Sequence, residues 1–179
     1  GLCDSRRLVA DGYRRGVPMG SRLNDAAPGS AKPRFLVSAM KDSEGAGLGA
    51  VQIVKGWVDA GGETREKVVT VAGSLEGGPS VDPATCAPTA AGGSELCAVW
   101  TDEEFDPATP AFWYVRVLEQ PTCRWHTHYC QRNGVNPFAA DCSAKAAEKG
   151  GNFGQCCSDS VERVIRERAW TSPIFWRAG

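Results

Sequence analysis

The chain contains eight cysteines, and this number constrains its fold more than any other feature of the sequence. An even count of thiols indicates either a disulfide framework or metal sites. Zinc modules usually carry paired Cys-x-x-Cys motifs, and none occurs here. Irregular spacing in loop-rich sequence therefore favours disulfides and an oxidising compartment. The residues expected to form disulfides are Cys3, Cys86, Cys97, Cys123, Cys130, Cys142, Cys156 and Cys157.

Most of the pairings stay open at this level, because cysteines distant in sequence can meet in many ways. A bond between the neighbours Cys156 and Cys157 is excluded as strained. Two local bonds are predicted, Cys86–Cys97 and Cys123–Cys130, each of which would close a short loop. The region that follows Pro121 has too little apolar content to fold on a core of its own. Cross-links are expected to order it.

Composition excludes several classes of protein. The 179 residues are 42% hydrophobic, which is enough for one domain with a buried core. With 20 basic and 21 acidic residues the net charge is −1. This balance argues against a nucleic-acid partner or a polybasic membrane-surface protein, because both need a concentrated excess of Lys and Arg. No apolar run approaches the ~20 residues of a membrane-spanning helix.

Five segments carry the pattern of β-strands, with turn residues between them. In several of them apolar residues recur at every second position, as do Phe35, Val37 and Ala39, which places these residues on one face. The last segment is apolar on both faces and is expected to be a central strand. The fold class is therefore mainly β, an antiparallel β-sandwich. The predicted strands are Arg34–Met40, Val51–Asp59, Arg65–Ala72, Leu96–Trp100 and Ala111–Leu118.

The sequence divides into a connector, residues 1–33, and a β-sandwich domain, residues 34–179. The connector holds a short helix at Ser5–Tyr13 and a Pro-Met-Gly turn. It begins without Met and without a signal region, as a piece of a longer or processed protein would. The domain includes a Cys-rich loop region, residues 121–157, with a short helix at Ser143–Lys149. Its aromatic C-terminal tail is expected to return to the edge of the sheet.

His126 and His128, the two histidines of the chain, are the candidate metal ligands. In an extended segment, residues two apart point the same way, so both imidazoles would reach one ion. Cys123 and Cys130 flank them and complete a zinc-like set of two sulfurs and two nitrogens. The alternative is a surface loop that is pinned by disulfides and exposes both imidazoles. An oxidising compartment favours this alternative.

Arg124 and Trp125 form one candidate binding cluster, and Glu167, Arg168 and Trp170 form a second. An ion pair stacked on indole would make a rigid polar surface that binds a ligand. The alternative is a structural clamp that joins the tail to the sheet, since Arg and Trp often pack together without binding anything.

No catalytic residue is predicted. The chain has neither a G-x-S-x-G elbow nor a P-loop motif, and its cysteines are committed to disulfides. The glycine-rich run Gly45–Ala50 lies between strands and is expected to be a flexible connection. The acidic run Asp102–Asp106 lacks the alternate-ligand spacing of an EF-hand loop. It is expected to be a solvated turn.

Four stretches of the sequence resemble the C-terminal part of a bacterial family known as domain of unknown function 3604 (DUF3604). DPATC and LCAVW fit the same family. Its members are similar to PHP-type metal-dependent phosphoesterases, so the resemblance implies a β-sandwich that follows a metal-binding catalytic domain, in an exported protein, periplasmic or extracellular. The four stretches are GYRRGVPMG (Gly12–Gly20), VQIVKGWVDAGGET (Val51–Thr64), AFWYVRVLEQPTCRW (Ala111–Trp125) and ERAWTSPIFW (Glu167–Trp176).

Three functional hypotheses follow. The leading hypothesis is a non-catalytic C-terminal β-domain of an exported PHP-like hydrolase. It needs no cofactor of its own, and its partner is the upstream catalytic domain, which would hold a divalent metal. The second is an independent extracellular module that binds a glycan or an envelope component. The third is a small metal-binding protein that uses His126 and His128.

Overall fold

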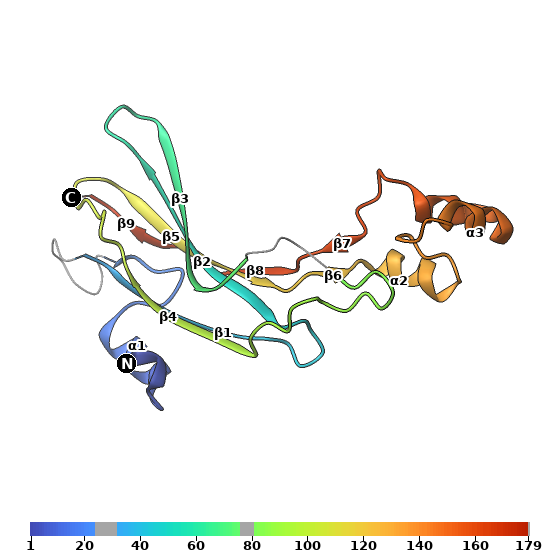
Figure 1. The fold of residues 1–179 in the computed structure, drawn as a ribbon. Helices are drawn as coiled ribbons and strands as arrows, with labels where there is room; N and C mark the ends of the chain where they lie inside the picture. Colours follow the sequence, from blue (N-terminus) through green and yellow to red (C-terminus); the bar gives the residue numbers. More distant parts are fainter. Residues whose placement is uncertain (24–31, 76–80, 179) are drawn as a thin grey trace.

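The computed structural model describes residues 1–23, 32–75 and 81–178, and it is mainly β, as predicted (Figure 1). One antiparallel sheet pairs β1 with β4. The other has the order β3-β2-β5, and both β8 and β9 pair with the outer edge of β5. The strands are β1 (Arg34–Met40), β2 (Leu48–Val58), β3 (Thr64–Gly73), β4 (Glu95–Thr101), β5 (Ala111–Glu119), β8 (Arg168–Trp170) and β9 (Ile174–Trp176).

The core forms where the two sheets face each other, as a sandwich requires. Phe35 and Val37 of β1 pack against Val51 and Ile53 of β2 and against Trp113 of β5. These residues alternate along their strands with side chains of the other face, which is the period-two pattern seen in the sequence. The five predicted strands are confirmed, with end points that shift by at most three residues.

Strand β2 is central, and it is buried on both faces from Leu48 to Gly56. Gly56 leaves room for the ring of Phe112, which lies on it. A Cβ atom at this position would stand 2.3 Å from the Cζ atom of Phe112. Strand β5 lies beside β2 on one edge and takes the tail strands β8 and β9 on the other. The segment Ala111–Leu118, predicted to be a central strand, is therefore confirmed as β5, which has partner strands on both edges. The predicted return of the tail to the sheet edge is also confirmed.

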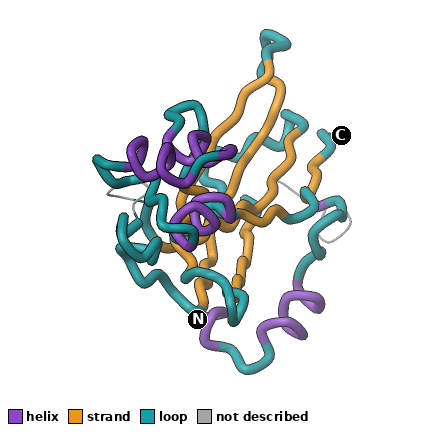
Figure 2. The backbone as a smooth tube through the Cα atoms, turned by 90° about the vertical axis from the view of Figure 1, so that its right-hand side faces the viewer, coloured by secondary structure: helices purple, strands orange, loops and turns teal. Residues whose placement is uncertain are grey.

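The N-terminal segment lies against the β1–β4 sheet and contains η1 (Leu2–Asp4) and α1 (Leu8–Arg15) (Figures 1 and 2). The predicted helix exists, but it begins and ends two to three residues later than Ser5–Tyr13. Gly12 lies within this helix. A Cβ atom there would lie 4.0 Å from Leu36 Cδ2, so Gly12 is where the helix approaches β1. No residue of α1 is buried.

Beyond β5 the chain leaves the sandwich through a two-stranded ribbon and enters a helical part, which lies apart from α1 (Figure 2). The region expected to be loops contains more helix than predicted, although the helix at Ser143–Lys149 is confirmed within α3. No helix of residues 1–23, 32–75 and 81–178 is long and apolar enough to cross a membrane. The ribbon is β6 (Thr122–Cys123) with β7 (Val164–Ile165), and the helices are α2 (Trp125–Arg132), α3 (Cys142–Lys149) and η3 (Gly151–Cys157).

All eight cysteines are paired, but neither of the two predicted local bonds forms. Cys123 lies on β6 and meets Cys86 beside Val81, whereas Cys130 lies on α2 and faces the core of the helical part. The predictions Cys86–Cys97 and Cys123–Cys130 are therefore wrong. They assumed that short loops close on themselves, whereas these bonds join different elements. The four bonds are Cys3–Cys97, Cys86–Cys123, Cys130–Cys156 and Cys142–Cys157.

We expect removal of the Cys130–Cys156 bond to unfold the helical part locally and to leave the sandwich folded. The bond spans 26 residues, and chain entropy gives such a bond about 3 kcal/mol. The small core around Val135 and Ala146 has few apolar side chains to replace this stabilisation. Limited proteolysis of a Cys130→Ser/Cys156→Ser variant should cleave residues 124–160 first.

The matched control is Cys3→Ser/Cys97→Ser, which removes the bond between η1 and β4. It should leave the helical part resistant to protease and expose only the N-terminal segment. Simultaneous cleavage throughout the first variant would show that the two parts unfold together, which contradicts the prediction.

Candidate functional site

A cavity of about 650 Å³ lies between the N-terminal segment and the open side of the sandwich. This volume is in the range of ligand and interaction pockets. Consecutive residues of β1, from Arg34 to Ser38, form one wall. The opposite wall comes from Trp113–Val115 of β5 and from the tail at Thr171–Ser172, Ile174 and Trp176. The cavity therefore reaches the core from the side on which the sheets do not close.

The rim of the cavity carries large apolar side chains that are exposed to solvent. Val9 and Tyr13 lie four residues apart on α1, hence on one face of the helix, and each is 67% exposed. Met19, 61% exposed, belongs to the Pro-Met-Gly turn that follows α1, in which Ser21 N–H donates to the carbonyl of Pro18. All three exposed side chains line the cavity. A helix with no buried residue and an exposed apolar face is one that can pack against another surface.

Behind the cavity wall, a buried ion pair holds Trp113 in place. Lys55 Nζ lies 2.7 Å from Asp102 Oδ2, and both side chains are less than 10% exposed. Trp113 Nε1 donates to the same Oδ2 at 3.1 Å. The ammonium group also lies over the rings of Trp57 and Trp113, 5.3 and 5.8 Å from their centroids. Asp102 therefore fixes the orientation of the Trp113 indole, which otherwise contacts the core and lines the cavity.

The expectation that Asp102–Asp106 is a solvated turn is wrong for its first residue. Asp102 is buried, and its Oδ1 accepts the backbone N–H of Glu104. The signal in the sequence was Lys55, which falls on the apolar face of β2 between Ile53 and Trp57. A lysine at such a position needs a buried partner of opposite charge.

His126 and His128 do not lie in an extended segment, because both belong to α2. Residues two apart in a helix point in nearly opposite directions, so the premise that both imidazoles face one ion is wrong. Cys123 and Cys130 are bonded to Cys86 and Cys156, so neither offers a thiolate. Across the described ranges, no group of three or more His, Cys, Asp or Glu could hold a metal ion.

The two Arg–Trp clusters lie on separate elements. Arg124 precedes α2, and its backbone N–H donates to the carbonyl of Arg163. In the other cluster, the guanidinium of Arg168 lies over the Trp170 ring, 5.9 Å from its centroid. Within the described residues, no ion pair joins Glu167 to either arginine. The predicted contact of cation and indole therefore exists within β8.

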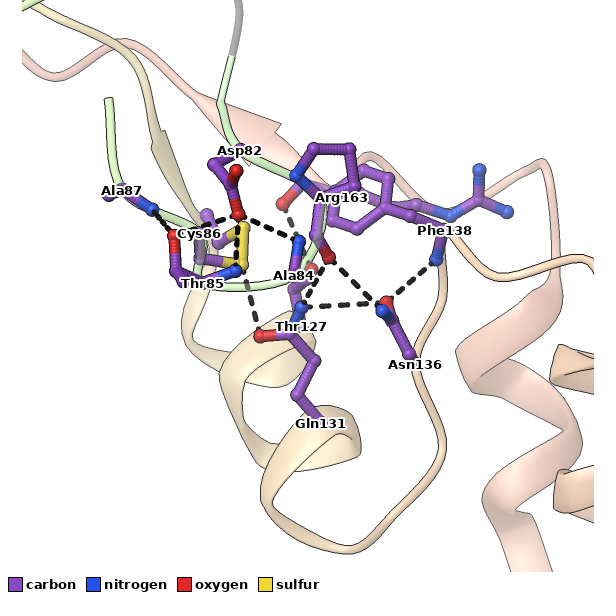
Figure 3. Close-up of a disulfide and its surroundings, with 12 residues drawn as sticks. Asp82, Ala84, Thr85, Cys86, Ala87, Thr127, Gln131, Asn136, Phe138 and Arg163 are labelled. Carbon is purple, nitrogen blue, oxygen red and sulfur yellow. Dashed lines mark hydrogen bonds between the residues drawn. A yellow bond between two sulfur atoms is a disulfide. The ribbon is translucent and has the colours of Figure 1, made fainter. Parts of the chain in front are cut away.

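The Cys86–Cys123 disulfide lies at the junction between sandwich and helical part (Figure 3). Asp82 Oδ1 accepts hydrogen bonds from the amides of Ala84 and Thr85. The Thr85 amide and hydroxyl hold the pKa of Asp82 below its usual value. Gln131 of α2 donates to the carbonyl of Pro83 at 3.0 Å. The loop of residues 82–86 is therefore attached to the helical part by polar contacts as well as by the disulfide.

The second face of the five-stranded sheet is aromatic and partly exposed. Phe112 and Tyr114 of β5 stack 6.4 Å apart, and Phe175 of β9 lies beside Phe112. Trp170 of β8 pairs with Arg116, which donates two hydrogen bonds to Gln52 Oε1. The sequence had singled out Trp170 but not this face, because pairing of the tail with β5 was needed to assemble it.

The architecture and its cross-links define a disulfide-stabilised β-sandwich domain with a small helical extension. The chain belongs to the family described as protein of unknown function (DUF3604), whose family model matches residues 1–178. The family expected from the sequence is therefore confirmed over nearly the whole chain. No curated protein and no solved structure matches the chain.

We expect Lys55→Met and Asp102→Asn each to lower the free energy of unfolding by about 3–5 kcal/mol, because each leaves one buried charge without its partner. The double variant should lose less than the sum of the two single losses, since it leaves no unpaired charge. Urea unfolding measures all three.

Lys67→Met is the matched control. It removes the exposed pair between Lys67 and Glu104, whose side chains are 42% and 66% exposed. Such a surface pair contributes at most about 1 kcal/mol. Equal losses for Lys55→Met and Lys67→Met would show that the buried pair does not hold the core.

Proposed function

We propose that this chain is a non-catalytic β-domain of an exported, PHP-like metal-dependent hydrolase, and that it packs on the upstream catalytic domain or borders its active site. Membership of the DUF3604 family supports the proposal. The four disulfides are consistent with an oxidising, extracellular or periplasmic environment.

The observation that carries the proposal is the N-terminal segment beside the cavity. The apolar side chains of Val9, Tyr13 and Met19 are exposed together at the rim of a cavity that opens onto the core. An apolar rim of this kind marks an interaction site. The Cys3–Cys97 bond fixes η1 to β4, so the segment is held in position although α1 buries nothing. The GVPMG turn, Gly16–Gly20, is the part that would border an active site.

The chemistry of the hydrolase would belong to the upstream domain. The described residues of this chain offer no cluster of carboxylates and imidazoles that fits a divalent metal. A metal bound upstream would supply an activated water and a Lewis acid for phosphoester hydrolysis. The role proposed for this chain is to cover and shape that site.

We expect Val9→Asp/Tyr13→Asp to weaken association between this chain and the upstream part of the same gene product at least tenfold. Burying a charge in an apolar contact costs well over the ~1.4 kcal/mol that corresponds to tenfold. Calorimetric titration of the two separately purified parts measures the change.

Val68→Asp is the matched control, because Val68 is an exposed valine on β3 and does not line the cavity. It should leave the affinity unchanged. The open reading frame gives an independent test. A gene that encodes only these residues after a signal sequence, or an upstream region without a metal-binding His and Asp set, would refute the proposal.

A second function, glycan binding, is favoured by the aromatic face of the sheet. Trp170 is 59% exposed and carries Arg168 over its ring. Phe112, Tyr114 and Phe175 extend the same face. Flat aromatic surfaces beside hydrogen-bonding side chains such as Arg116 suit sugar rings, which present an apolar face and polar edges.

If this second function holds, a glycan array will give the isolated chain a saturable ligand, and Trp170→Ala will weaken its binding at least tenfold, as for a central aromatic anchor. Trp125→Ala is the matched control, since Trp125 is 79% exposed on α2, away from the sheet. An array without a ligand, or equal effects of the two variants, rejects the aromatic face as a glycan site.

A further inference from the structure

In the part of the chain that the structure describes, the edge of β1 that faces away from β4 has no partner strand. Among the described residues β1 pairs with β4 alone. Asp102 N–H donates to the carbonyl of Pro33 at one end of the pair, and Lys41 N–H donates to the carbonyl of Ser94 at the other. In an antiparallel ladder every second residue bonds to the partner strand. The odd-numbered residues of β1 therefore bond to β4, and the even-numbered ones point their N–H and C=O groups outward.

Three of the outward residues belong to the cavity wall. Leu36 and Ser38 present their backbone groups on this edge, and Arg34 does so at its start. The residues between them, Phe35 and Val37, face the core. An incoming strand would therefore bond to Leu36 and Ser38. Its alternate side chains would enter the cavity beside Trp113 and Ile174.

Past Arg34, the described part of this edge has neither proline nor charge, two of the devices by which proteins protect exposed strands. The opposite outer strand, β3, differs, because it carries Arg65, Glu66 and Lys67 at its exposed end. Charged side chains prevent edge-to-edge pairing, so β3 is protected and β1 is open.

We infer that β1 accepts an extended strand of the upstream domain by β-sheet augmentation, and that the cavity takes the apolar side chains of that strand. The choice of the upstream domain as donor rests on the proposed function, in which that domain packs on Val9, Tyr13 and Met19. These side chains line the same cavity as the free edge of β1. A domain that packs on α1 is thereby placed beside β1. Main-chain hydrogen bonds would provide affinity, and the cavity would provide specificity.

The charges at the mouth of the cavity specify the donor further. Arg15 and Arg34 line it, whereas Asp11 is already paired with Arg14 and Lys32 with Glu103. The net charge of the side chains at the mouth of the cavity is therefore positive. We therefore expect the donor strand to carry an acidic residue at the end that lies beside Arg34, with apolar residues at alternate positions along the rest.

The test compares amide hydrogen exchange, resolved by residue, in the isolated chain and in the complete gene product. In the isolated chain the amides of Leu36 and Ser38 should exchange at least about a hundredfold faster than that of Val37, which bonds to β4. In the complete gene product they should be protected to the level of Val37. This measurement needs no variant.

Ser38→Pro provides the matching variant, because it removes an outward N–H that bonds to nothing in β4, and proline is tolerated on strand edges. It should weaken association with the upstream part at least tenfold. Glu66→Pro is the matched control. Asp59 N–H donates to the carbonyl of Glu63, so by the same alternation the backbone N–H of Glu66 points away from β2. It should leave association unchanged.

Three outcomes overturn the inference. If Val9→Asp/Tyr13→Asp weakens association while Leu36 and Ser38 stay unprotected, the proposed function stands and strand addition does not. If the isolated chain already protects both amides and has the mass of a dimer, a second copy occupies the edge. If the two parts do not associate at all, the proposed function and this inference fail together.

Discussion

Trp113 is the side chain on which the packing of the two sheets depends. Its ring lies 5.1 Å from that of Phe35 across the sandwich and 6.1 Å from that of Phe105. Its N–H has one polar partner, the carboxylate of Asp102. Because that carboxylate is buried, it requires Lys55, and Lys55 in turn stacks on the indole. Aromatic packing and the buried ion pair therefore both hold the Trp113 side chain in place. They also make rigid the part of the cavity wall that Trp113 forms.

The parts of the fold that were predictable from the sequence are those set by local periodicity. Phe35 and Val37 recur at alternate positions, and the strand Ala111–Leu118 is apolar on both faces, so strand positions and the central strand followed directly. The disulfide pairs did not follow. Whether Cys86 meets Cys97 or Cys123 depends on where β6 and α2 lie, which no spacing encodes. The assumption of an extended chain also misplaced His126 and His128, because the α2 sequence carries weak helix signals.

The candidate site was predictable only in fragments. The exposed residue Trp170 and the Pro-Met-Gly turn could be singled out. The cavity, however, joins residues from both ends of the chain, and the aromatic face joins β5 to the C-terminal tail. Gly20 N–H donates to the carbonyl of Pro173, and Phe175 N–H to that of Ser21. These contacts bring the N-terminal segment to the tail, and long-range pairing of this kind has no local signature. Asp102 was missed for the same reason, since its partner Lys55 lies on another strand.

Disulfides and apolar burial stabilise different parts of this molecule, and the division explains where it can interact. The sandwich has a continuous core, and the helical part has a small one that Cys130–Cys156 and Cys142–Cys157 cross. In the N-terminal segment α1 has no buried residue, and a disulfide together with backbone hydrogen bonds to the tail holds the segment in place. A covalent tether fixes position without consuming apolar surface. The side chains of Val9 and Tyr13 therefore stay exposed beside an open strand edge, where a partner can use both.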